Sequence, residues 1–263
     1  MKKLTLDEIK DIEFGILSAF AKFCRENGMR FFLSNGTLLG AVKYGGFIPW
    51  DDDIDVLMPR EDYDRFIAEF EDTERYRLFS ESRSEGYRFP FAKLCDRKTI
   101  KSEETELASD SLKMGLCIDI FPIDGFSNLE ISSRMRALFI RICTALLCLS
   151  AQKDTQKRSI IIKLAKAIGY EKLRRLHSFA SRSRGEAKYC GNAVWTVRGA
   201  HEVMHRRVFS DTVEVLFCGG QFPAPIGFDE YLRSMYGDYE KEPPINKRSS
   251  HHSFEAYLNG GDL

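Results

Sequence analysis

Neither sign of charge is in excess in this chain of 263 residues, because Lys plus Arg and Asp plus Glu each count 39. A neutral chain produces no long-range field that would attract a nucleic acid polymer or an anionic membrane, so any polyanion must be bound by local groups. The seven cysteines are scattered, odd in number and free of any Cys-x-x-Cys pair. This pattern argues against a disulfide framework and a cysteine zinc finger, and it predicts reduced, mostly buried thiols in a cytoplasmic protein.

We expect neither a signal peptide nor a membrane-spanning run in this sequence. The N-terminal stretch MKKLTLDEIKDIEFGILSAF carries four acids where a signal peptide needs an apolar core, so we do not expect secretion. The most apolar run, residues 137–151, is too short to span a bilayer and has Arg141 in its middle. It predicts a buried helix, with a helix lying in the membrane interface as the alternative. We expect a cytoplasmic protein, with peripheral association at the inner face of the membrane left open.

Hydrophobic periodicity predicts an α/β chain with a helical insertion and a C-terminal helical part. Helical spacing is found over 5–27, 35–46, 60–71, 129–185 and 228–239. Strand-like segments are 29–34, 53–58, 75–79, 87–95, 115–121 and the strand-turn-strand 213–225. The Lys- and Arg-rich part near 172–184 is typical of a solvated helix face. We predict a catalytic core over 1–128, a helical segment over 129–190 and a C-terminal strand–helix segment over 191–263 that completes the site.

Four acids crowd the stretch GFIPWDDDIDVLMPR, residues 46–60, next to an apolar segment. If the end of this stretch is extended, Asp53 and Asp55 share one face, opposite the core-facing Ile54. Three interpretations compete: a solvated acidic loop, a calcium loop of EF-hand type, and a divalent-metal site for phosphoryl transfer. The solvated loop is disfavoured because a buried strand follows directly. The calcium loop lacks the required glycine at its sixth position, Val56, and its twelfth is Asp rather than Glu.

The metal interpretation requires phosphate donors and a further acid, and the sequence offers both. In LSNGTLLG a helix begins near Asn35, Gly36 is small enough for close approach to a phosphate, and Thr37 adds a hydroxyl. In MGLCIDIFPIDG, Asp119 interrupts an apolar strand, where a carboxylate is costly unless it pairs with a cation. Capping of Asp119 by an arginine is the alternative to a metal site.

Four longer stretches follow one another along most of the chain: SNGTLLGAVKYGGFIPWDDDIDVLMPREDYDRF, FAKLCD, GLCIDIFPIDG and YLRSMYGDYEKEPP. Together they resemble the LicD family, which includes bacterial choline-phosphotransferases and is related to fukutin-related protein. The resemblance is weakest from about 129 to 190. It implies a nucleotidyltransferase fold of the DNA polymerase β superfamily, with a mixed β-sheet flanked by helices. The family's Gly-Ser helix and Asp-x-Asp strand match Gly36-Thr37 and Asp53-Ile54-Asp55, with Thr in place of Ser.

The resemblance also implies a reaction and its site residues. A phosphorylated alcohol, such as phosphocholine, would pass from a CDP-linked donor to a sugar hydroxyl of a cell-surface glycan, with release of CMP. Mg²⁺ or Mn²⁺ would neutralise the diphosphate, so positioning and electrostatics would dominate catalysis. The implied metal ligands and catalytic acids are Asp53, Asp55 and Asp119, with Asp119 as a second metal contact or a base. The implied substrate-binding residues are Asn35, Gly36, Thr37, Trp50, Asp51, Lys93, Lys247, Arg248, His251 and His252.

Some of these substrate-binding assignments have an alternative. Trp50 adjoins the acids and could hold a quaternary ammonium by a cation–π contact. Lys93 is a candidate phosphate contact, although an exposed lysine would give the same sequence pattern. The basic C-terminal cluster around Arg248 could close over donor phosphates, or it could be a solvent-exposed tail.

The segment HEVMH, residues 201–205, matches the HExxH pattern of zinc peptidases. That site needs a sustained helix and a third ligand, whereas the strand-like RRVFSDTVEVLF follows at once without a ligand at a familiar spacing. We therefore predict that the match is accidental. Two functions besides the transferase stay open: a nucleotidyltransferase that moves NMP from an NTP to a small molecule, and a catalytically silent glycan- or nucleotide-binding protein on the same fold.

Overall fold

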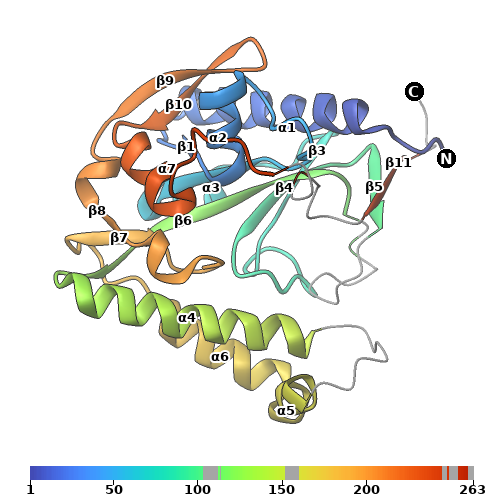
Figure 1. The fold of residues 1–263 in the computed structure, drawn as a ribbon. Helices are drawn as coiled ribbons and strands as arrows, with labels where there is room; N and C mark the ends of the chain where they lie inside the picture. The colour runs from blue at the N-terminus through green and yellow to red at the C-terminus, as the bar shows by residue number, and fades with distance from the viewer. Residues whose placement is uncertain (103–111, 113, 152–159, 245–247, 249–253, 260–263) are drawn as a thin grey trace.

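A mixed β-sheet crosses the middle of the molecule, with helices on both of its sides (Figure 1). The structure is a computed structural model that describes residues 1–102, 112, 114–151, 160–244, 248 and 254–259. Helices α1 (Leu6–Glu26) and α2 (Asn35–Tyr44) lie above the sheet in Figure 1, and α4 (Glu130–Ser150) lies below it. This arrangement confirms the predicted α/β class with a mixed sheet flanked by helices.

Helix α1 begins where the sequence predicts, because Thr5 and Glu8 form a capping box at its N-terminus. Its apolar stripe buries Ile16 and Phe20 completely, and the helix ends at Asn27 before Gly28. Helix α3 (Arg60–Glu69) packs against it, with the Phe20 and Phe66 rings edge to face at 5.0 Å between centroids. These contacts fix the helical layer over one face of the sheet.

The main sheet has the strand order β1 (Phe32–Leu33), β2 (Asp55–Pro59), β6 (Cys117–Ser127), β4 (Ala92–Asp96) and β3 (Tyr76–Phe79). Only the β2–β6 pair is parallel, and the other pairs in this path are antiparallel. The far part of β6 pairs with β7 (Tyr189–Asn192), which pairs with β8 (Met204–His205). Strand β6 therefore lies at the centre of the sheet and carries Asp119 into its middle.

Two small antiparallel strand pairs and a short helix complete the fold. Strands β9 (Thr212–Phe217) and β10 (Gly220–Pro225) form the predicted strand-turn-strand. Helix α7 (Phe228–Tyr236) follows, as predicted. Strands β5 (Thr99–Ser102) and β11 (Glu255–Leu258) pair across more than 150 residues, and the sequence analysis predicted neither.

Several strand boundaries differ from the prediction. The strand expected over 29–34 forms only at Phe32–Leu33, and the one expected over 87–95 begins at Ala92. Strand β6 continues past the predicted end at 121 through FPIDGFS, a polar and Gly-containing stretch. It can do so because Arg60 donates two hydrogen bonds, of 2.8 and 2.6 Å, to the fully buried carboxylate of Asp124.

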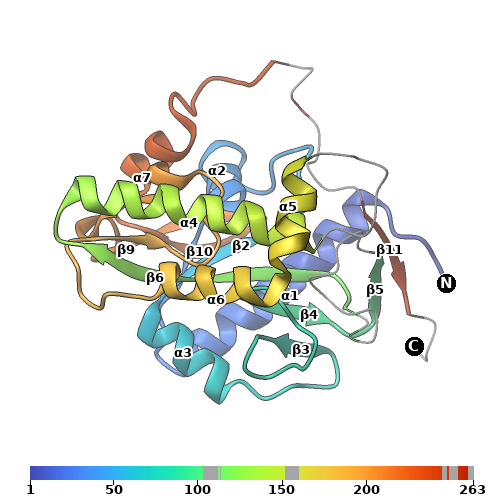
Figure 2. The ribbon, with the colours of Figure 1, turned by 90° about the horizontal axis from the view of Figure 1, so that it is seen from below.

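Helices α4, α5 (Ile160–Ile168) and α6 (Tyr170–Ser181) form a layer of their own below the sheet (Figures 1 and 2). Helix α4 buries Ala137, Ile140 and Leu147, and Arg136 Nε donates to the Ala180 carbonyl of α6 at 3.0 Å. The prediction of a buried helix over 137–151 was only half right, because the opposite side of α4 is exposed. Helices α5 and α6 pack against α4 with residues such as Ala165 and Leu173, but they leave that side uncovered. Among the described helices, none is long and apolar enough to cross a bilayer.

His177 of α6 gives a testable acid sensitivity to this layer. Burial lowers the pKa of His177 to about 4, against a hydrogen bond to the Val194 backbone that raises it. The unfolded chain, with a His pKa of about 6.5, takes up the proton first as the pH falls, so stability present above pH 6.5 is lost toward pH 4. We expect His177 to account for about 2 kcal/mol of lost unfolding free energy at about pH 5.

Urea unfolding at about pH 7 and about pH 5 measures this loss. The variant His177→Gln should lose about 2 kcal/mol less than the wild type between the two pH values. The exposed His201 provides the control, since His201→Gln should keep the wild-type pH dependence. Equal pH dependence of wild type and His177→Gln would show that His177 is not the sensitive group.

Candidate active site

Three charged side chains form a row across adjacent strands of the main sheet. Asp55 of β2 is the register partner of Asp119 of β6, which is in turn the register partner of Lys93 of β4. Register partners point to the same face of a sheet, so the three side chains share one face. Lys93 Nζ lies 2.7 Å from Asp119 Oδ1. The cation that a carboxylate within an apolar strand needs is therefore a lysine from the neighbouring strand.

The N-terminus of α2 faces the same row. Asn35 has a positive φ of 45°, which places it at the sharp entry into the helix. Its side-chain amide donates to Asp55 Oδ2 at 3.0 Å, and its side-chain oxygen accepts a hydrogen bond from the Tyr231 hydroxyl at 2.9 Å. Asn35 thus joins α2, β2 and α7 and fixes the direction of the Asp55 carboxylate.

Thr37 and Gly36 occupy this helix terminus in different ways. The Thr37 side chain is buried, and its hydroxyl accepts a hydrogen bond from the Asp55 backbone N–H at 2.8 Å. A Cβ at Gly36 would lie 2.8 Å from Asp51 Oδ2, so a larger residue here would displace that carboxylate. Asp51 therefore lies at the positive end of the α2 dipole, and the role of Gly36 and Thr37 in phosphate binding stays a prediction.

The acids Asp53, Asp55 and Asp119 are close enough to affect one another. Burial raises the pKa of Asp55 well above its usual value, and the neighbouring Asp53 and Asp119 charges raise it further. The hydrogen bond from Asn35 partly opposes this shift. Asp53 itself lies before the strand, because β2 begins at Asp55 rather than at residue 53. The sequence placed Asp53 and Asp55 together on one face of a strand. In the structure only Asp55 belongs to β2, and Asp53 lies in the segment that leads into it.

A cavity of about 650 Å³ opens over these side chains. Its size suits a small organic ligand with phosphate groups. The sequence-predicted residues that line it are Asn35, Gly36, Trp50, Asp51, Asp53, Asp55 and Asp119. Further residues of the wall, to which the sequence analysis gave no role in substrate binding, include Lys43, Trp195, Arg198, Glu202 and Tyr236. Arg198 stacks over the Tyr236 ring at 4.4 Å, and no motif in the sequence marks Arg198.

Trp50, Trp195 and Tyr236 line the cavity, and we refer to them as the aromatic wall. Trp50 contacts Arg248 of the basic C-terminal cluster. The guanidinium carbon of Arg248 lies 5.4 Å from the centre of the Trp50 ring, and Tyr44 packs against that ring edge to face at 6.5 Å. Arg248 also pairs with Glu242 at 3.5 Å. The predicted contacts of Lys247, His251 and His252 lie outside the described residues.

The donor set of this site fits a hard divalent cation. The acids Asp53, Asp55 and Asp119 offer oxygen ligands only, which are the ligands that Mg²⁺ and Mn²⁺ prefer. Within the described part of the chain, no three His, Cys, Asp or Glu side chains are already arranged as a metal site. Asp119 contacts Lys93 through Oδ1, so its second oxygen, Oδ2, would be the one to join Asp55 as a ligand.

The HEVMH segment has a different geometry from a zinc peptidase site. Gly199–Glu202 forms a short 3₁₀ turn, and the chain then enters β8, so His201 and His205 are not one turn apart on a helix. Glu202 is buried and accepts a hydrogen bond from the Arg198 backbone N–H at 2.6 Å, and burial raises its pKa to about 7. The structure confirms the prediction that HEVMH does not lie on one sustained helix. Glu202 instead holds the backbone of Arg198, which lines the cavity.

Comparison with known proteins agrees with the site. Residues 28–135 match the family model described as LicD/FKTN/FKRP, nucleotidyltransferase domain. The "Lipopolysaccharide cholinephosphotransferase LicD" of Haemophilus influenzae is 31% identical over 98% of this chain and 100% of its own length. Two uncharacterized Rickettsia proteins match shorter parts: RT0683 of R. typhi is 32% identical over 24% of the chain, and RP689 of R. prowazekii is 46% identical over 14%. They cover 20% and 14% of their own lengths. The family model spans the α2 terminus and the acids of β2 and β6, and with the Haemophilus influenzae match over nearly the whole chain it shows that the chain belongs to the LicD family.

Proposed function

We propose that this chain transfers a phosphorylated alcohol, such as phosphocholine, from a CDP-linked donor to a sugar hydroxyl of a cell-surface glycan. The acceptor oxygen forms a bond to the phosphorus that carries the alcohol, the bond from that phosphorus to the CMP oxygen breaks, and the hydroxyl proton leaves. The observation that carries the proposal is the similarity to the Haemophilus influenzae enzyme over 98% of the chain. The converging acids and the helix terminus support it.

Asp53, Asp55 and Asp119 would hold Mg²⁺ or Mn²⁺, which when bound neutralises the diphosphate and the leaving CMP. The chain's own residues provide the positioning. Asn35 holds the Asp55 carboxylate through a 3.0 Å hydrogen bond, and Lys93 holds Asp119 at 2.7 Å. The α2 terminus can place backbone N–H groups against a phosphate. Asp119 is the candidate base for the hydroxyl proton when it is not a metal ligand.

The aromatic wall supports an alcohol with a cationic head. Trp50 lines the cavity and already holds the Arg248 guanidinium over its ring at 5.4 Å, so its face is suited to a positive group. Trp195 and Tyr236 line the same cavity. A quaternary ammonium would find its cation–π partner among these rings. We also propose a cytoplasmic location, which the seven free cysteines support.

A nucleotidyltransferase that moves NMP from an NTP is the second candidate function. The same carboxylates and helix terminus would serve it, and the two reactions differ in which side of the diphosphate is kept. Mass-spectrometric screening separates them. The full chain with Mg²⁺, an acceptor glycan and CDP-choline, CDP-ribitol or CDP-glycerol should release CMP, whereas NTPs should release no pyrophosphate. Pyrophosphate release without CMP release would favour the nucleotidyltransferase, and neither product would favour a silent binding protein.

Divalent ions are expected to raise the melting temperature of this chain. They bind the folded acids and hardly the unfolded chain, so each kcal/mol of binding free energy should add about 2–4 °C. Thermal unfolding with and without millimolar Mg²⁺, with CDP in a second series, measures the shift. The variant Asp53→Asn should show a smaller shift, while Asp11→Asn on the exposed side of α1 should keep it. An unchanged melting temperature in both series would argue against metal binding by these acids.

A further inference from the structure

The outer side of α4 exposes a continuous set of large apolar side chains. Their spacing of three, four and seven residues places them on one face of the helix, opposite the buried Ala137, Ile140 and Leu147. An apolar surface of this size that is exposed to water marks a site where a partner or a membrane binds. The exposed fractions are 76% for Ile131, 69% for Met135, 51% for Leu138, 47% for Phe139 and 51% for Ile142.

The neighbouring helices α5 and α6 extend this apolar surface. Eleven of the seventeen large hydrophobic side chains that are exposed in the described residues lie between Leu129 and Phe179. They include Ile160 and Leu164 of α5 and Phe179 of α6, which is 79% exposed. Both views show α4, α5 and α6 together at one side of the molecule (Figures 1 and 2). We refer to the exposed apolar residues of α4, α5 and α6 as the outer helical face.

The segment that carries α4, α5 and α6 is strongly basic, unlike the chain as a whole. Residues 129–190 contain fourteen Lys and Arg against four Asp and Glu, whereas the whole chain has 39 of each. The remainder of the chain is correspondingly acidic. A second copy of this chain would bring two strongly positive surfaces together, which is unfavourable. Charge complementarity instead favours an anionic partner.

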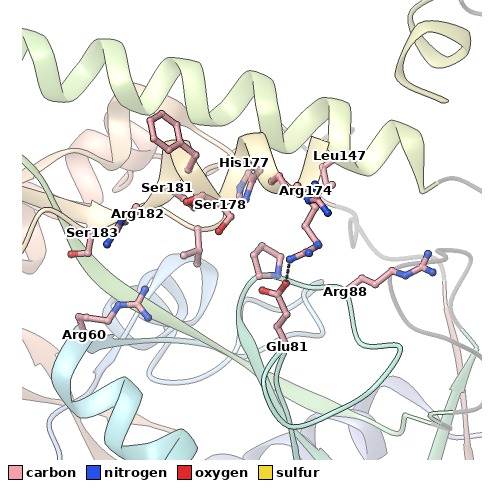
Figure 3. Close-up of a pocket in the computed structure, with 14 residues that line it drawn as sticks. Arg60, Glu81, Arg88, Leu147, Arg174, His177, Ser178, Ser181, Arg182 and Ser183 are labelled. Atoms are coloured by element: carbon pink, nitrogen blue, oxygen red, sulfur yellow. Dashed lines mark hydrogen bonds and ion pairs between the residues drawn. The ribbon is translucent and has the colours of Figure 1, made fainter. Parts of the chain in front are cut away.

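An arginine-lined cavity of about 620 Å³ lies beside α6 (Figure 3). Arg174 is paired with Glu81 across it, and Arg60 is paired with Asp124. No ion pair joins Arg88, Arg175 or Arg182 to a carboxylate of the described residues, although all three line the cavity. The exposed Phe179 lines it as well, so the cavity borders an exposed apolar side chain of α6. Apolar side chains next to unpaired arginines match a lipid surface with anionic headgroups.

We propose that α4, α5 and α6 dock this protein onto an anionic lipid bilayer. The apolar side chains of the outer helical face enter the boundary between headgroups and acyl chains. Arg175 and Arg182 contact headgroup phosphates, and the helices lie in the plane of the membrane without crossing it. The inference does not depend on the proposed reaction, because it concerns binding alone.

Sedimentation with vesicles tests the docking. The full chain should bind vesicles of phosphatidylcholine mixed with phosphatidylglycerol far more tightly than vesicles of phosphatidylcholine alone, and rising salt should weaken the binding. The triple variant Met135→Ser, Leu138→Ser and Ile142→Ser should lose affinity by about tenfold or more. The double variant Arg175→Gln and Arg182→Gln should lose about tenfold on the anionic vesicles only.

Variants of exposed residues on other surfaces control for the kind of change. Leu216→Ser with Ile226→Ser removes two apolar side chains that are each 49% exposed outside the segment, and Lys22→Gln with Lys98→Gln removes two exposed charges. Both controls should bind vesicles as the wild type does. Melting temperatures confirm that each variant is folded. The docking proposal is overturned if the wild type binds neither vesicle, or if the triple variant binds unchanged. Light scattering that shows a dimer broken by the triple variant would assign the face to a second copy instead.

Discussion

Replacement of Asp55 by Asn is expected to lower the rate of CMP release by about 10³–10⁴-fold while the protein stays folded. Asp55 lies between the Asn35 amide and Asp119, so it is the carboxylate that joins the α2 terminus to the sheet. Asn keeps an oxygen that can accept the hydrogen bond from Asn35, but it removes the charge. Since burial and neighbouring acids disfavour that charge, the melting temperature should stay equal or rise. Asp53→Asn should behave in the same way.

The assay for this prediction is CMP release at saturating Mg²⁺ together with thermal unfolding of each variant. Asp11→Asn, at an exposed position of α1, is the matched control and should keep full activity. Activity close to that of the wild type in Asp55→Asn would remove this residue from the site. A variant that melts far below the wild type would instead show that Asp55 has a structural role.

The structure brings the three predicted acids to one cavity, and the sequence could indicate them because their signal is local. Asp53, Asp55 and Asp119 are carboxylates beside or within apolar strands, and such positions are costly without a partner. The contact of Lys93 with Asp119 could not be predicted in the same way. Lys93 was expected as a phosphate contact, but the strand register places it 2.7 Å from Asp119. That register depends on the pairing of β4 with β6, which hydrophobic alternation alone does not specify.

The contacts of residues that reach the site from far along the chain could not be predicted. Tyr231 is 196 residues from Asn35 and holds it through its hydroxyl, yet nothing in the stretch YLRSMYGDYEKEPP indicates that contact. Arg198 lies in a loop whose direction depends on the buried Glu202. Both positions follow from tertiary packing, which helical and strand periodicity do not encode.

The same limit applies to the fold. Helix α1 was predicted closely, because its capping box and apolar stripe are local features. Strands β5 and β11 were missed, since they are short and pair with each other across more than 150 residues. Helix α4 is apolar on nearly every side, so periodicity could not tell a buried helix from a half-exposed one.

Asp119→Ala is expected to lower CMP release by about 10³–10⁴-fold, whereas His201→Ala with His205→Ala should leave it nearly unchanged. The histidines do not share a helix, and the catalytic charges lie on β2 and β6 instead. Chelators that remove zinc and spare magnesium should likewise have no effect. The reverse pattern, with essential histidines and a dispensable Asp119, would overturn the assignment of the site.

The contact between Lys93 and Asp119 allows a sharper test of how Asp119 works. Lys93 is buried between the Phe89 and Phe91 rings, so Lys93→Met keeps most of its volume and removes the charge. If Lys93 acts only by positioning Asp119, Lys93→Met should cost less activity than Asp119→Ala, and the double variant should be no worse than Asp119→Ala alone. If Lys93 also contacts donor phosphates, the two losses should add, and the KM for the CDP-alcohol should rise in Lys93→Met. The non-additive result would assign Lys93 to orientation of the carboxylate, as the 2.7 Å contact indicates.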